Sequence, residues 1–390
     1  MTEQNQNEKK TYRAVRRIKR NNGAQSAVPQ AEMLDGSRLK KHEEQHNEKV
    51  RKEQPELQKR DQTDAAKDSS MKKRRLPDRH VARKQWIVCY SLLLLVVVVC
   101  LILLATKNTD TPGQKELKIP QERENGETID IPVTAYLPAG RDAVPLVVFC
   151  HGFTGNRQLD GHYLPMAQQL AAKGIASVSL DFPGNGESTE EFESYTIQHM
   201  QDDITCVIDY MCQHYKIAED KIGILGHSMG GRVVSLRLDS SIKAAALWSP
   251  ADRPGLEGLE FVDHDAETLD QMRVQAMLEG SVLAWNVPIS STFIEEMANS
   301  NPLEPIQNYE GALLLAFTGQ DEELFSRETI DMTMTAARSR ELPFVDLSAA
   351  FPDSTHNYTA KEEDDSKEKD AEIRGRIESQ TIEFFCDTLL

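Results

Sequence analysis

A single turn, Gly226-His227-Ser228-Met229-Gly230, constrains the fold of this chain more than any other segment. It follows a β-branched, apolar run at 221–225 and precedes a run of helical character at 230–238. Small neighbours two residues before and after the serine suit a sharp strand-to-helix turn with unfavourable backbone angles. Such a turn raises the Ser228 hydroxyl above the sheet and directs the Met229 amide, at a helix start, towards developing negative charge.

Short β-branched segments alternate with longer helical ones on both sides of this turn. Strands are expected at 131–137, 145–150, 175–180, 221–225, 242–248, 312–317 and 343–347, and helices at 163–173, 194–215, 230–238 and 373–385. This alternation predicts an α/β fold with a mainly parallel sheet covered by helices on both faces. Residues 251–305 depart from this alternation, with short helices expected at 267–281 and 291–299 and no strand between them. We predict that they form a cap insertion whose apolar residues roof a pocket.

An uncharged run of 21 residues, 86–106, precedes this α/β region. A helix of that length rises about 31 Å, enough to cross the hydrocarbon core of a membrane. A cleaved signal peptide fits poorly, because the run begins more than 80 residues into the chain and lacks a small-x-small cleavage site. Seven Lys and Arg residues at 72–84 precede the run, so the positive-inside rule places the N-terminus in the cytoplasm and the C-terminal part outside.

Charge divides the chain into two parts. Residues 1–84 hold 23 Lys and Arg against 13 Asp and Glu, a net charge of +10, whereas 85–390 carry −27. The first part has Tyr12 as its only aromatic residue and is expected to be a disordered, basic cytoplasmic tail. Its basic end should attract anionic membrane lipids. The acidic second part argues against nucleic acid as a partner. We therefore predict a tail (1–84), a transmembrane helix (85–107), a linker (108–116) and an α/β domain (117–390).

A second motif, His151-Gly152-Phe153-Thr154-Gly155, directly follows the predicted strand at 145–150. In strand-turn-helix sites of this kind, the loop after that strand supplies a second amide to the oxyanion. The Phe153 backbone N–H is the candidate for this donor. His151, beside the strand end, is predicted to support the loop rather than to act as a base.

Three segments resemble the α/β-hydrolase superfamily: 151–155, Asp181-Phe182-Pro183-Gly184-Asn185-Gly186-Glu187-Ser188, and 226–231. Within it the chain is similar to bacterial serine esterases of the cinnamoyl/feruloyl esterase, monoacylglycerol lipase and serine aminopeptidase-like group. The likeness covers roughly 117–390. The middle motif departs from the family pattern, because Asn185 stands where the family usually has histidine.

The resemblance implies a catalytic triad in the order serine, acid, histidine. Asp321 follows the strand at 312–317 and is the expected acid, with Glu322 as the alternative. His356 lies beyond the last predicted strand and is the expected base. These roles imply an acyl-enzyme on Ser228 and no requirement for a metal or an organic cofactor.

Three functions stay open at this point. An ester hydrolase with a small-molecule substrate is favoured. An aminopeptidase-like amidase would need a cap carboxylate to hold a free amine, and the available residues are Glu295, Glu296, Asp263 and Asp265. A non-catalytic binding or scaffold protein could also retain the fold. The substrate and the oligomeric state do not follow from the sequence.

Overall fold

The computed structural model describes residues 112–140, 142–361 and 367–390. The predicted tail, the predicted transmembrane segment and the start of the predicted linker lie outside these residues. Within the described ranges, no helix combines the length and the apolar character that a membrane span requires.

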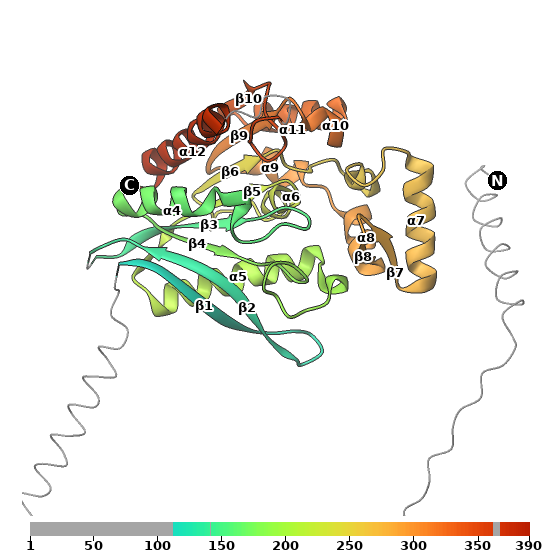
Figure 1. The fold of residues 1–390 in the computed structure, drawn as a ribbon, viewed down its shortest axis with the longest axis horizontal. Coiled ribbons are helices and arrows are strands. Elements are labelled where there is room, and N and C mark those ends of the chain that lie inside the picture. Colours follow the sequence, from blue (N-terminus) through green and yellow to red (C-terminus); the bar gives the residue numbers. More distant parts are fainter. Residues whose placement is uncertain (1–111, 141, 362–366) are drawn as a thin grey trace, which may run out of the picture. The chain divides into compact units, whose positions relative to one another are not determined.

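An eight-stranded sheet forms the centre of the described region (Figure 1). Its spatial order is β1-β2-β4-β3-β5-β6-β9-β10. The strands are β1 (Gly113–Glu122), β2 (Thr128–Leu137), β3 (Val144–Cys150), β4 (Ala176–Leu180), β5 (Ile217–His227), β6 (Ala244–Trp248), β9 (Ala312–Thr318) and β10 (Val345–Phe351). β2 pairs antiparallel with β1 and β4, and the other neighbours are parallel. The predicted α/β class with a mainly parallel sheet is confirmed.

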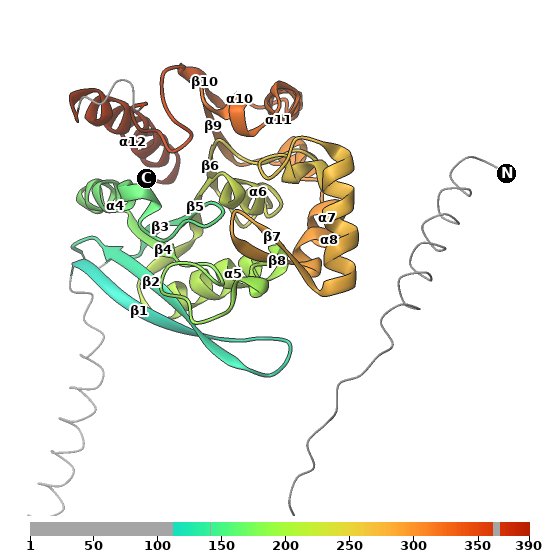
Figure 2. The ribbon, with the colours of Figure 1, turned by 45° about the vertical axis from the view of Figure 1, so that its right-hand side comes forward.

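Helices cover both faces of the sheet, as Figure 2 shows. α4 (Tyr163–Ala172) and α12 (Lys367–Leu389) share one apolar core with Val147 and Phe149 of β3. Residues Leu146 and Val148 of the same strand face the opposite core, which includes α5 (Ile197–His214) and α6 (Met229–Ser235). Short apolar strands are buried on both sides here, because alternate side chains enter different cores. Further elements outside the cap are η1 (Leu159–Gly161), η2 (Phe192–Ser194), α9 (Leu303–Asn308), α10 (Asp321–Leu324) and α11 (Arg327–Ser339).

The cap lies between β6 and β9, at the edge of the domain labelled α7 and α8 in Figure 1. It contains η3 (Leu256–Leu259), α7 (Ala266–Glu279), β7 (Ser281–Ala284), β8 (Val287–Ser290) and α8 (Ser291–Asn299). β7 and β8 form an antiparallel hairpin, which the sequence did not predict. Its two turn residues, Trp285 and Asn286, have φ angles of 48° and 64°, as a two-residue type I′ turn requires.

The buried Arg232 of α6 ties the two ends of the cap together. Its guanidinium donates hydrogen bonds to the carbonyls of Ala251 (2.8 Å) and Arg253 (2.7 Å) at the beginning of the insertion. At the other end it donates to the hydroxyl of Ser300, also at 2.7 Å. The Gly255 amide donates to the Ser300 carbonyl at 3.0 Å. The cap therefore leaves the sheet layer and returns to it at one place.

The edge strand β1 begins at an earlier residue than the predicted start of the domain, Leu117. β1 starts at Gly113, inside the segment 108–116 that was expected to be a linker. All ten residues of β1 pair with β2 in register from Gly113 opposite Leu137 to Glu122 opposite Thr128. The folded domain therefore includes residues before Leu117.

Candidate active site

The Ser228 turn has the strained geometry that its sequence predicts. Ser228 lies between β5 and α6 with φ 56° and ψ −120°, and its amide donates to the Trp248 carbonyl at 2.9 Å. A Cβ at Gly226 would come within 2.5 Å of the Gly230 carbonyl oxygen. A Cβ at Gly230 would overlap the carbonyl oxygens of Cys150 and His151. Both glycines are thus required by backbone contacts, which leave no room for a side chain.

Asp321, and not Glu322, contacts His356. Asp321 is fully buried at the start of α10, and its Oδ1 lies 2.6 Å from His356 Nδ1. Glu322 points away and pairs with Arg327 at 3.0 Å on the exposed surface. An ionised carboxylate can only accept, so the proton of this bond resides on Nδ1 and Nε2 is left with a free lone pair.

Two further groups hold the Asp321 carboxylate from its other oxygen. Oδ2 accepts hydrogen bonds from the Ser249 hydroxyl and the Thr318 amide, both at 2.6 Å. Ser249 has φ 45° after β6 and also lies 3.0 Å from the Tyr358 hydroxyl. Sequence reasoning missed Ser249, because no local motif marks a side chain that acts on a residue 72 positions away.

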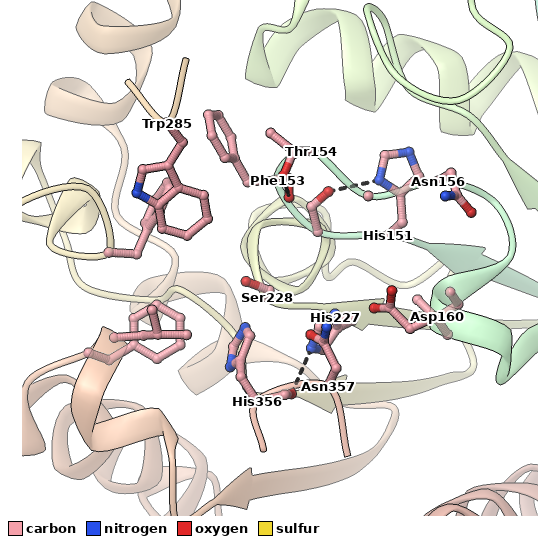
Figure 3. Close-up of a pocket in the computed structure, with 16 residues that line it drawn as sticks. His151, Phe153, Thr154, Asn156, Asp160, His227, Ser228, Trp285, His356 and Asn357 are labelled. Atoms are coloured by element: carbon pink, nitrogen blue, oxygen red, sulfur yellow. Dashed lines mark hydrogen bonds between the residues drawn. The ribbon is translucent and has the colours of Figure 1, made fainter. Parts of the chain in front are cut away.

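Ser228 and His356 line the same pocket, which has a volume of about 210 Å³ (Figure 3). Its apolar wall contains Phe153, Phe261 and Trp285, with Phe325 also lining the cavity. Within the described ranges, no hydrogen bond joins the Ser228 hydroxyl to the imidazole of His356. Such bonds are often long before substrate binds and tighten in the complex.

The two predicted oxyanion donors flank Ser228. Met229 is the first residue of α6, so its amide belongs to the turn that has no acceptor within the helix. The loop of Phe153 packs on the serine, since a Cβ at Gly152 would come within 2.9 Å of Ser228 Cβ. The Phe153 ring contacts Trp285 and Phe261, with ring centroids 5.7 Å and 5.3 Å away.

His151 supports this loop, as its position in the sequence predicted. Its Nε2 accepts a hydrogen bond from the Phe182 amide at 3.0 Å. Its Nδ1 lies 2.8 Å from the Gly152 carbonyl, to which it must donate. Burial lowers the pKa of His151 below its usual range, which favours this neutral form. Both ring nitrogens are therefore engaged in holding the loop after β3.

The four cap carboxylates that could hold a substrate amine do not line the pocket. Each has another partner: Arg273 for Glu295 (2.6 Å), the Ile197 amide for Glu296 (2.5 Å), the Thr268 amide for Asp265 (2.9 Å) and the Asp265 amide for Asp263 (2.8 Å). Of the described residues that line the pocket, only Asp160 carries a carboxylate. In the same ranges, no group of His, Cys, Asp and Glu is arranged to hold a metal ion.

Comparisons with known proteins agree with this architecture. A family model described as "Serine aminopeptidase, S33" matches residues 141–298. An uncharacterized 31.7 kDa Escherichia coli protein from the traX-finO intergenic region is 33% identical over 102 residues, which are 26% of this chain and 35% of that protein. The 2,6-dihydropseudooxynicotine hydrolase of Paenarthrobacter nicotinovorans is 26% identical over 157 residues, 38% of each chain. The chain thus spans little more than a third of these curated relatives.

Solved structures share the fold. Est1E from Butyrivibrio proteoclasticus, with ferulic acid bound, superimposes with a TM-score of 0.53 at 20% identity, over 67% of this chain and 96% of that one. An acylaminoacyl peptidase from Pyrococcus horikoshii gives a TM-score of 0.50 at 17% identity, over 73% of this chain and 43% of that one. By its sheet order and serine turn, the chain has the α/β-hydrolase fold, and the family match agrees with this. It resembles the serine hydrolases that share this fold, which include esterases and peptidases.

Proposed function

We propose that this protein is a serine hydrolase that cleaves carboxylic esters through an acyl-enzyme on Ser228. The observation that carries the proposal is the 2.6 Å bond between Asp321 and His356 Nδ1, in a pocket that Ser228 also lines. This bond leaves His356 Nε2 as the free base on the side of the imidazole away from the acid. Ser228, His356 and Asp321 are the proposed catalytic triad.

The reaction follows from these positions. Ser228 Oγ attacks the ester carbonyl carbon while His356 Nε2 takes its proton, and the carbonyl π electrons move onto the oxygen. The amides of Phe153 and Met229 donate hydrogen bonds to that oxyanion. Collapse of the tetrahedral intermediate breaks the bond to the alcohol, which leaves with the proton from His356. Water then attacks the acyl carbon while His356 takes its proton, the bond to Ser228 Oγ breaks, the carboxylic acid leaves, and Oγ regains a proton from His356.

The pocket wall supports an ester with a flat apolar group on one side of the scissile bond. Phe153, Phe261 and Trp285 contact one another, with ring centroids 5.3 to 5.7 Å apart. Aromatic side chains at these separations offer faces and edges to a planar apolar group. A cap site for a free substrate amine is disfavoured, because the four candidate carboxylates already accept hydrogen bonds from other groups of the protein: Glu295, Glu296, Asp263 and Asp265.

One observation favours a second candidate, an aminopeptidase-like amidase. Asp160 lines the pocket, and within the described ranges its carboxylate has no hydrogen-bond or ion-pair partner. A substrate ammonium group placed there would gain a charge-assisted hydrogen bond. Comparing Asp160→Asn with the unmodified protein on aminoacyl p-nitroanilides tests this candidate. A selective loss of anilide turnover would support it.

A fluorophosphonate probe tests the hydrolase proposal itself. The full-length protein should be labelled, and Ser228→Ala should not, whereas Ser249→Ala retains the nucleophile and should still be labelled. A panel of p-nitrophenyl esters beside aminoacyl p-nitroanilides then separates the reactions. Faster turnover of the anilides would favour the amidase. An absence of Ser228-dependent labelling would favour a binding or scaffold protein.

We further propose that this domain is anchored to a membrane by residues 86–106, with the N-terminus in the cytoplasm and the catalytic domain outside. The length of the uncharged run and the basic residues at 72–84 support this topology. A membrane-impermeant protease applied to intact cells should remove the catalytic domain. Protection of the domain until the cells are lysed would contradict the placement.

A further inference from the structure

The segment that carries His356 is held by its backbone as well as by Asp321. The His356 amide donates to Gln320 Oε1 at 3.0 Å. The carbonyls of His356 and Asn357, which are consecutive along the chain, each face the ring nitrogen of another histidine. Three polar groups of the backbone at residues 356 and 357 therefore have side-chain partners from outside the segment.

His227 provides the first of these partners. Its Nε2 lies 3.0 Å from the His356 carbonyl oxygen, and the two imidazole centroids are 4.8 Å apart. A carbonyl can only accept, so Nε2 carries the proton and donates it. Burial first, and the neighbouring His356 second, hold the pKa of His227 well below its usual range. His227 is therefore a neutral donor next to the nucleophile in the chain.

His162 provides the second partner from a different part of the fold. It directly precedes α4, is buried, and places Nε2 3.0 Å from the Asn357 carbonyl oxygen. Its Nδ1 lies 2.7 Å from Oε1 of Glu378, a buried residue of α12. Since Nε2 must donate, Glu378 and Nδ1 share one further proton, which fixes the ring orientation. The Trp248 ring packs edge-on against the imidazole at a centroid distance of 5.4 Å.

These contacts determine where His356 lies relative to Ser228. Asp321 fixes the rotation of the imidazole, but the height of the ring above the serine depends on the backbone at 356 and 357. Asn357 lines the pocket, and residues 356 and 357 form a turn that belongs to no helix or strand. A displacement of about 1 Å at a reacting group can reduce the rate by about 100-fold. Two buried donors from separate elements would prevent such a displacement.

We propose that His162 and His227 are positioning residues that fix the His356 segment by donating hydrogen bonds to its consecutive carbonyls, and that Glu378 orients His162. The inference rests on the proposed triad and concerns how its base is placed. Neither histidine exchanges a proton with substrate. Ordinary core packing is the competing explanation, and it predicts an effect on stability alone.

Two pairs of variants distinguish these explanations. His162→Gln retains a side-chain N–H near the position of Nε2, whereas His162→Asn is also an amide but is too short to reach the Asn357 carbonyl. His227→Gln and His227→Asn form the same pair against His356. His264→Asn is the control, because it breaks an imidazole–carbonyl contact of 3.2 Å to Glu323 outside this segment. All are made in the full-length protein and assayed on one p-nitrophenyl ester, below the unfolding temperature of each variant.

We expect His162→Asn to lower kcat by about 10- to 100-fold with KM changed by less than about threefold. His162→Gln should recover kcat to within about fivefold of the unmodified protein, and the His227 pair should behave alike. His264→Asn should leave both constants unchanged. Equal kcat for the Asn and Gln variants, at any level, would overturn the positioning role. An unmodified protein with no Ser228-dependent turnover would instead remove the proposed function, and the two failures are therefore distinguishable.

Discussion

α6 begins directly after Ser228, whereas α7 lies in the cap, and the two helices are packed very differently. All seven residues of α6 are buried, whereas α7 buries only Leu269 and Ala276 of its fourteen residues. α6 belongs to the sheet layer that carries Ser228, and α7 belongs to the cap that carries Trp285. The first region has one arrangement enforced by backbone contacts, while the second rests on few buried side chains and should open locally at a lower free energy. Bond breaking is thus expected to depend on the more rigid region around α6, and substrate selection on the less rigid cap.

The largest expected effect tests the rigid region at Asp321. Asp321→Asn should lower kcat by roughly 10⁴-fold, because an amide can donate to Nδ1 and so favours the wrong His356 tautomer. Steady-state kinetics on the preferred ester would measure it. Glu322→Gln is the matched control and should leave kcat unchanged, since Glu322 is paired with Arg327 at the surface. The reverse result would assign the acid to Glu322.

The second prediction concerns the glycines of the same region. Gly230→Ala places a methyl group against the carbonyls of Cys150 and His151, so it should lower the free energy of unfolding by about 1 to 3 kcal/mol. Chemical denaturation measures this change. Gly375→Ala, on the exposed side of α12 with open space around it, should instead add about 0.5 to 1 kcal/mol. Equal stability of the two variants would contradict the steric account of the turn.

In the cap, Trp285→Ala should alter selectivity more than rate. Removing the indole from the wall formed with Phe153 and Phe261 should lower kcat/KM for an aryl-acyl ester by about 10-fold, the value of a few aromatic contacts. The acetyl ester should change little. Leu283→Ala, which lies on the same hairpin but is 71% exposed and does not line the pocket, serves as control. A comparable loss on both esters would show that the cap acts on the chemistry itself.

The smallest expected effect is the pH dependence of folding. The pKa of His227 is held well below 6.5 in the folded chain, so below about pH 6.5 the unfolded chain binds a proton that the folded chain does not. Stability from this group is therefore present above pH 6.5 and is lost as the pH falls. His227→Gln should reduce the slope of stability against pH by at most about 1.4 kcal/mol per pH unit. Denaturant midpoints between pH 7 and 5 measure it, and an unchanged slope would contradict the assignment.

Much of the rigid region could be predicted from the sequence. The strand-turn-helix around Ser228 has a local steric requirement, and the short apolar strands are buried on both faces, so both leave clear patterns. The same pattern is absent from β1, whose sequence GQKELKIPQE alternates charged and apolar residues and contains Pro120. β1 lies at the edge of the sheet, where such residues are tolerated, so no strand was predicted there and its first four residues fell within the predicted linker at 108–116.

The cap and the contacts around His356 were harder to predict, for two physical reasons. The β7–β8 hairpin turns at Trp285-Asn286 without a glycine, so the usual turn signal is missing. His162 meets the Asn357 carbonyl across 195 sequence positions, and a hydrogen bond to a backbone carbonyl requires no particular residue type at position 357. Only the folded chain brings such groups together. Sequence order placed Asp321 and His356 near one another, but not the donors that hold them.

The Arg232 contact has a consequence for how such domains can diversify. Because Ala251, Arg253 and Ser300 meet at one guanidinium, the inserted segment begins and ends at adjacent points of the scaffold. Replacing the residues between those points should leave the sheet order and the positions of Ser228, Asp321 and His356 unchanged. A chimera that exchanges residues 254–299 for another length of chain, with Arg232 retained, should still fold. The cap can therefore be regarded as an exchangeable module. Arg232 is the fixed attachment point that any replacement segment would need to contact at both of its ends.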